Sequence, residues 1–176
     1  IGVTGVQTCA LPISRYRLAA TGNSNYGWFG GGGAPATVST VDRIDFSNDS
    51  ATASVRGPLS LARQNLAASG NSNYGWFGGG TVPTPAVFST VDRIDFTNDS
   101  VTASSRGLLS LARQQAGATS GQAKSSSILL GKTLGYGWFG GGYVPGPTYY
   151  ATVDRINFAN DFVTEVARGS LSQRSE

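Results

Sequence analysis

The sequence predicts an all-β protein of about three four-stranded antiparallel sheets that stack on one another. One pattern of motifs occurs three times along the 176 residues, 25 of which are Gly, and only 13% of the residues are charged. Such a composition favours short strands and tight turns over helices. A single small sheet cannot bury both of its faces, so each sheet needs a neighbour to cover it.

The repeat is visible in three motifs. An aromatic-glycine motif, Tyr-Gly-Trp-Phe-Gly-Gly-Gly, a Thr-Val-Asp-Arg-Ile motif and an Arg-Gly motif that precedes a Leu-Ser pair each return in the same order. The copies divide the chain into units of about residues 15–63, 64–113 and 114–173. A period of this length is typical of repeat architectures.

Each unit carries four strand signals in a fixed order. In the second unit they are a small-residue segment (66–69), an aromatic segment (74–77), an alternating segment (90–96) and a Val/Thr segment (101–104). Alternation over residues 90–96 places Asp92 and Ile94 on one face and Arg93 on the other. Tight turns between these segments predict one antiparallel meander per unit.

The two ends differ from the rest. Residues 1–13 resemble the translation of a sequencing adapter, residues 174–176 resemble the start of its complement, and we expect residues 14–173 to be the native part of a longer chain. Cys9 then carries no information, and the remaining sequence has neither His nor Cys. We therefore expect no imidazole base, no zinc site and no cofactor.

The charge and hydropathy point to no special surface. A net charge of +3 is too small to predict a nucleic-acid partner, and no run of apolar residues is long enough to predict a membrane span.

The order of motifs resembles the kelch repeat, the blade of one β-propeller family. The resemblance covers residues 15–173 and rests on the aromatic strand that ends in Gly-Gly, the strand that ends in an acid and an aromatic residue, and the closing Ala-Arg. A kelch blade normally has Trp in its last strand, whereas this chain has Thr52, Thr102 and Thr164 there. The resemblance implies a kelch-like β-propeller fragment whose further blades come from missing parts of the chain or from other chains.

The aromatic-glycine strands are expected to form the contact between sheets, because glycine permits close approach and positive φ. The alternative is a glycan platform, since aromatic rings stack on sugars. The residues concerned are Gly30, Gly31, Gly78, Gly79, Gly140, Gly141, Trp28, Trp76 and Trp138.

Each unit also has about three Arg and three Asp. We expect ion pairs between neighbouring sheets that fix their register, rather than a calcium site, because the Asp spacing does not match an EF-hand loop. The residues expected in these pairs are Asp42, Asp92, Asp154, Arg63 and Arg113.

Variation between copies gathers in the loops after the Gly triplet (33–39, 81–89, 143–151) and, on the sequence pattern, in the connection between units (114–125). Both kinds of connection should emerge on one side of the array, which is typical of a binding surface, although neutral drift would also produce variation. The candidate ligand-binding residues are Tyr143, Tyr149, Tyr150, Phe88, Gln114 and Lys124.

The predicted function is a non-catalytic scaffold or recognition module for a protein or a glycan, in a phage or bacterial surface protein. The alternative is a propeller domain of a larger enzyme. Some kelch-type propellers resemble galactose oxidase, whose chemistry needs copper held by His and Tyr and a Cys crosslinked to Tyr; here the catalytic residues would lie outside the sequence in hand.

Overall fold

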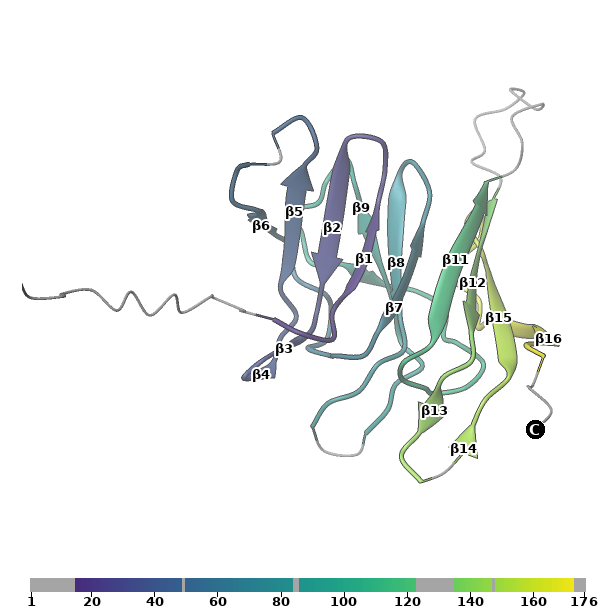
Figure 1. Cartoon of the computed structure of the whole chain (residues 1–176). Helices are drawn as coiled ribbons and strands as arrows, with labels where there is room; N and C mark the ends of the chain where they lie inside the picture. The colour runs from purple at the N-terminus through teal and green to yellow at the C-terminus, as the bar shows by residue number, and fades with distance from the viewer. Residues whose placement is uncertain (1–14, 49, 84–85, 123–134, 147, 173–176) are drawn as a thin grey trace, which may run out of the picture.

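A computed structural model describes residues 15–48, 50–83, 86–122, 135–146 and 148–172. These residues contain no helix; they form three four-stranded antiparallel sheets and two small hairpins, which confirms the predicted fold class (Figure 1). Accordingly, no helix within these ranges is suited by length and apolarity to cross a membrane.

Each sheet is a meander built from one sequence repeat. The first has the order β1 (Ala19–Gly22), β2 (Tyr26–Gly30), β5 (Val41–Asp45) and β6 (Ser54–Arg56). The second has β7 (Ala67–Gly70), β8 (Tyr74–Gly78), β9 (Val91–Asp95) and β10 (Ser104–Ser105), and the third has β11 (Gly117–Gln122), β12 (Gly135–Gly140), β15 (Thr152–Asn157) and β16 (Val166–Ser170). Two hairpins extend the loops after β2 and β12: β3 (Gly33–Ala34) with β4 (Ala36–Thr37), and β13 (Tyr143–Val144) with β14 (Thr148–Tyr149).

The three sheets lie side by side like the leaves of an open fan (Figure 1). Their first strands, β1, β7 and β11, are neighbours from sheet to sheet. These strands consist almost entirely of Ala, Ser, Thr and Gly, whose small side chains let the backbones approach.

The apolar core lies between the sheets rather than within any one of them. Trp28 of the first sheet packs with Phe77 and Phe96 of the second, and both Trp28 and Phe77 are fully buried. The second interface uses the equivalent residues Trp76, Phe139 and Phe158. Every sheet therefore depends on its neighbour for burial, as expected for stacked repeats.

The predicted fourth strand of the second unit is wrong in position: β10 begins at Ser104, three residues later than expected. The preceding segment leaves the sheet to reach the first unit, because the carbonyl of Asp99 accepts a hydrogen bond from Gly57 N (2.8 Å) and Ala103 N donates to Pro58 O (2.8 Å). Val101, expected in the strand, is half exposed in this connection.

The expected expansion of the connection between units is also wrong. The third unit gains its length between β11 and β12, where Gln122 pairs with Gly135. That end of the sheet is opposite to Gly140, from which the variable loop after β12 leaves. The connection between β11 and β12 thus begins and ends at the edge of the sheet opposite to the predicted binding side.

Candidate functional site

Glycines make the close approach between sheets, in two different ways. A Cβ at Gly78 would lie 2.8 Å from the ring of Phe139, so the phenylalanine of one sheet rests directly on the glycine of the sheet before it. The next residue, Gly79, has φ +68°, and a Cβ there would meet the carbonyl oxygen of Arg113 at 2.6 Å. Gly30 with Gly31 repeats this arrangement in the first sheet. The structure therefore places Gly30, Gly31, Gly78, Gly79, Trp28 and Trp76 between sheets.

A buried carboxylate joins each pair of sheets. The indole N–H of Trp28 donates to Asp99 Oδ2 at 2.8 Å, and Arg43 donates to the same oxygen at 3.0 Å. Asp99 is only 7% exposed, and the guanidinium of Arg56 lies 3.6 Å from it. The second interface has the same arrangement, with Trp76, Arg93, Arg106 and Asp161. In that interface, burial lowers the pKa of the Arg106 guanidinium and the nearby charge of Arg93 adds to the effect.

The predicted Arg–Asp pairs are present in the structure. Arg63 donates to Asp92 at 2.7 Å and to the carbonyl of Thr90 at 2.9 Å, while its own carbonyl accepts from Gly32 N of the first sheet at 2.8 Å. The Arg63 and Asp92 side chains are fully buried, and this burial lowers the pKa of the Arg63 guanidinium against the opposing effect of Asp92. The same pairing joins Arg113 to Asp154 and Arg15 to Asp42.

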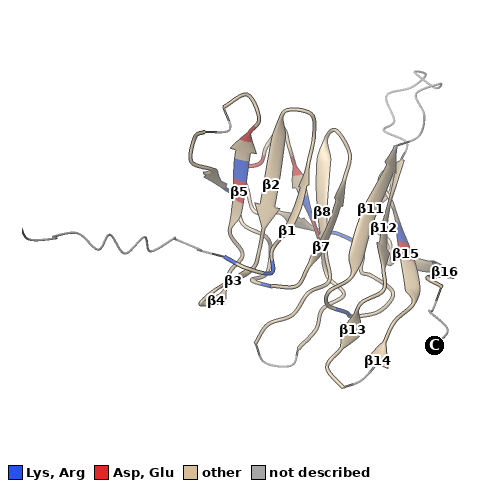
Figure 2. Ribbon diagram, in the orientation of Figure 1, with Lys and Arg blue, Asp and Glu red and all other residues tan. Residues whose placement is uncertain are grey.

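Residues of opposite charge lie next to one another on the third strand of a meander. Blue and red segments adjoin on β5 and on β15 (Figure 2). Among the described residues, no group of three or more acidic, His or Cys side chains is arranged to hold a metal ion.

A polar groove of about 550 Å³ lies at the end of the sheets where the variable loops emerge. All three repeats contribute to it with the residues before their first strands and with the loops after the Gly triplets. We call this surface the loop groove; it is lined by Tyr16, Arg17, Pro35, Gln64, Asn65, Thr81, Val82, Pro83, Gln114, Gln115, Tyr143 and Pro145.

The floor of the loop groove has an unusual backbone. Arg17, Asn65 and Gln115 occupy equivalent positions in the three repeats and all have φ between 55° and 58°. Asn65 N donates to Arg17 O at 2.8 Å, and Gln115 N donates to Asn65 O at 2.9 Å. This left-handed conformation is strained for residues other than glycine and often marks functional sites. Here it aligns one residue per repeat along the groove.

The candidate tyrosines lie beside this groove. Tyr143 and Tyr149 face each other across the β13–β14 hairpin with ring centroids 5.7 Å apart, and Tyr149 is 77% exposed. With Tyr150 they line a further hollow of about 480 Å³. The structure thus brings the three tyrosines together at one place.

Of the other three candidate ligand-binding residues, Phe88, Gln114 and Lys124, the structure describes the first two, and neither is exposed. Phe88 is half buried, and its backbone bonds to Gly80 and Arg113. Gln114 is a correction: it is only 6% exposed, and its side-chain carbonyl already accepts a hydrogen bond from Asn65 at 3.0 Å, so it supports the groove floor rather than offering a free amide. Lys124 lies outside the described residues.

Sequence reasoning missed the left-handed residues and the central role of Asp99 and Asp161. Neither acid was assigned a partner from the sequence, since a turn sequence gives no sign that its carboxylate points inward. The signal available was an Asp that lies three residues after the same Phe in every unit, at positions 49, 99 and 161.

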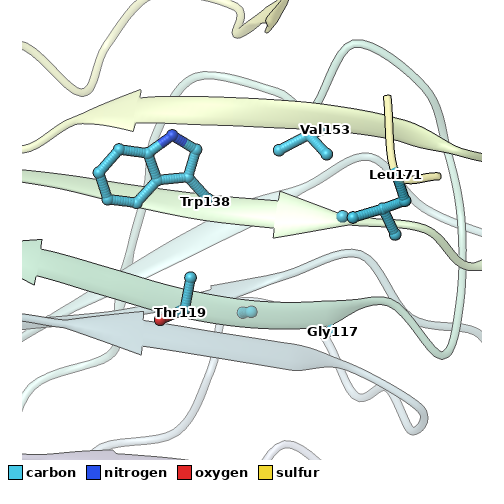
Figure 3. Close-up of a pocket in the computed structure, with 7 residues that line it drawn as sticks. Gly117, Thr119, Trp138, Val153 and Leu171 are labelled. Carbon is cyan, nitrogen blue, oxygen red and sulfur yellow. The ribbon is translucent and has the colours of Figure 1, made fainter. Parts of the chain in front are cut away.

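A second hollow, of about 230 Å³, lies on the outer face of the third sheet (Figure 3). Its lining is almost wholly apolar and comprises Gly117, Ala118, Thr119, Trp138, Gly140, Val153 and Leu171. Unlike Trp28 and Trp76, Trp138 is only half buried. Two of the predicted site residues, Trp138 and Gly140, therefore border an open face, whereas Gly141 is buried under Leu171.

Comparisons with known proteins bear on the fold alone. No protein-family model matches the sequence, and no curated protein matches it. Among solved structures, 139 chains match, including one described as "Structure of YjhT" with a TM-score of 0.67 and 13% sequence identity. The match covers 88% of this chain and 46% of that one, so this chain spans less than half the length of its structural neighbour.

Proposed function

We propose that the chain is a kelch-like segment of a β-propeller and acts as a non-catalytic recognition module whose ligand binds in the loop groove. The observation that supports this most directly is that equivalent positions of all three repeats line one groove. The loops at its rim differ in sequence among all three copies. A constant scaffold below variable loops is typical of binding proteins.

The chemistry of the groove favours a glycan over a protein among the two ligand classes. Its lining includes the side-chain amide of Gln115 and the amide oxygen of Asn65, whose nitrogen donates to Gln114; such amides donate and accept hydrogen bonds as sugar hydroxyls require. Tyr16 and Tyr143 add ring faces at its edge, and Tyr16 is 48% exposed. Tyr gives contact area at little cost in conformational entropy.

Binding to a glycan array, followed by calorimetry with the strongest ligand, tests the proposal. Replacing Tyr143 and Tyr149 by Ala should leave the fold intact and weaken binding by about tenfold or more. Val55→Ala is the matched control, because Val55 is 70% exposed on β6, away from the groove. Retention of full affinity by the tyrosine variant, with a folded protein, would contradict the groove as the binding site.

A peptide array distinguishes the two ligand classes. Binding that is confined to peptides and that depends on the same tyrosines would keep the loop groove as the site and exclude the glycan assignment.

A further inference from the structure

The two interfaces inside the chain use one set of contacts. A phenylalanine ring covers a glycine of the preceding sheet, as Phe77 covers Gly30 with ring atoms 2.8–3.2 Å from the position of a Cβ. A second ring stacks on the tryptophan, as Phe96 does on Trp28 at 3.8 Å with an interplanar angle of 6°. A carboxylate completes the set by accepting the indole N–H.

The second interface matches the first in each of these contacts. Phe139 covers Gly78, and Phe158 stacks on Trp76 at 4.1 Å and 12°. The same set of contacts therefore joins each repeat to the next. One face of a sheet contributes the glycine and the tryptophan, and the facing sheet contributes the two phenylalanines.

The outer face of the third sheet shows the receiving half of this set without its partner. The hollow of about 230 Å³ lies over Gly140 and beside Trp138, where a phenylalanine ring would rest (Figure 3). Leu171 is 51% exposed, whereas its equivalents Leu59 and Leu109 are each 2% exposed. Nothing lies within 4 Å of a Cβ placed at Gly169, although a Cβ at the equivalent Gly107 would meet the carbonyl of the next repeat at 1.7 Å.

Two arginines of the third sheet, Arg155 and Arg168, also lack, within the described part of the chain, the carboxylate partner that their equivalents have. Arg155 lies over the ring of Tyr136 at 4.2 Å, as Arg43 lies over Tyr26 at 4.4 Å. Arg43 reaches a carboxylate of the next repeat, whereas Arg155 and Arg168 form no ion pair with any described residue. Glu165 is near enough for both cations to influence its pKa but forms no ion pair with them.

The outer face of the first sheet carries the opposite half. Phe46 is 54% exposed, whereas its equivalents Phe96 and Phe158 are 9% and 6% exposed. Phe29 is half buried, whereas its equivalent Phe77 is fully buried. Phe46 packs over Gly27 of its own sheet, just as Phe96 packs over Gly75, so its ring is already positioned on the outer face.

We infer that the third sheet of one chain binds the first sheet of a second copy of the same chain, head to tail, with Phe29 over Gly140 and Phe46 stacked on Trp138. The two faces are complementary because each carries the half that the other lacks. Two copies contribute six sheets, which lies within the four to eight of closed propellers, so a pair of chains with two such contacts forms a ring. The inference is independent of the loop groove.

Sedimentation velocity of the full chain under reducing conditions, from about 1 µM to about 1 mM, tests this inference. We expect a species of twice the 18.2 kDa chain mass that dissociates on dilution, with a red shift of Trp138 emission. Gly140→Ala and Phe46→Ala should each raise the dissociation constant about tenfold or more without changing the melting temperature of the monomer. Tyr149→Ala is the control and should leave association unchanged.

Mixing distinguishes head-to-tail contact from any symmetric one. Gly140→Ala chains keep an intact first sheet and Phe46→Ala chains keep an intact third sheet. A mixed pair therefore forms one contact between two intact faces, whereas either variant alone forms none, so an equal mixture should associate better than either variant alone. A wild-type chain that stays monomeric throughout would mean that other sequence in the same chain covers these faces, and the inference would be wrong. A dimer that neither variant weakens, or a mixture that restores nothing, would overturn it equally.

Discussion

Replacing Gly78 by Ala adds one methyl group at the tightest contact between the second and third sheets. Its Cβ would lie 2.8 Å from the nearest ring atom of Phe139, well inside the ordinary contact distance of 3.4–4 Å. The ring of Phe139 is fully buried. The same substitution at Gly140 has a different outcome, because its nearest neighbour there is a methyl of Val153 at 3.3 Å.

The expected change in stability has two parts. Overpacking of this kind costs about 1–3 kcal/mol. Gly78 does not have positive φ, so alanine fits its backbone and returns about 0.4–1 kcal/mol by restricting the unfolded chain. We therefore expect Gly78→Ala to lower the free energy of unfolding by about 1–2 kcal/mol and Gly140→Ala to change it by less than about 0.5 kcal/mol.

Urea unfolding, followed by circular dichroism and by tryptophan fluorescence, measures both changes. Coincident transitions by the two probes are needed, because repeat arrays can unfold in parts. Phe139→Leu in the Gly78→Ala background should cost less than in the wild type, with a coupling of about 0.5 kcal/mol or more, since the smaller side chain makes room for the methyl. The reasoning is refuted if Gly78→Ala unfolds at the wild-type urea concentration, or if Gly140→Ala costs as much.

Three further outcomes are expected, each measured by the same unfolding experiment. Asp99→Asn should cost about 2 kcal/mol because it leaves two guanidinium groups without their carboxylate. Asp95→Asn, at the end of β9, should cost less than about 0.5 kcal/mol because the Asp95 carboxylate accepts hydrogen bonds from Thr97 alone among the described residues; equal losses would remove the central role of Asp99. Arg63→Met should cost about 3–5 kcal/mol, and adding Asp92→Asn should recover part of the loss; no recovery would exclude an uncompensated carboxylate as the cause. Burial, with repulsion from nearby carboxylates, raises the pKa of Glu165 to about 7 from 4.5. The folded state therefore binds the proton more tightly, and the free energy of unfolding falls as pH rises from about 4.5 to about 7. Glu165→Gln should abolish this slope and gain about 1–2 kcal/mol at pH 8, and an unchanged slope would contradict the expectation.

The repeating parts of the fold are predictable from the sequence because each motif has one local cause. Aromatic and alternating segments give β8 and β9 almost at their predicted bounds, and Gly79 and Gly80, which follow β8, have the positive φ that favours glycine. The strand that was misplaced, β10, is the one whose position depends on the neighbouring repeat: Asp99 turns inward to meet Trp28, which delays the pairing of the strand. No local propensity reports a contact of that kind.

The loop groove was predictable only in outline. Topology and sequence variation indicate the side of the array, and Tyr143 and Tyr149 do lie there. The left-handed residues Arg17, Asn65 and Gln115 were not predicted, because Arg and Gln have no preference for positive φ and the reason for their conformation is a hydrogen bond from one repeat to the next. Contacts between repeats decide this part of the site.

The pairing of a phenylalanine ring with a bare glycine has a consequence for how such a chain changes length in evolution. Each unit presents a phenylalanine on one face and a glycine on the other, and the same phenylalanine–glycine contact joins each successive pair of units. Tandem duplication of the coding segment therefore adds a unit that fits at once, with no compensating substitution. The number of units can change in a single recombination event, while a substitution at Gly78 or Phe139 damages one joint and leaves the others intact.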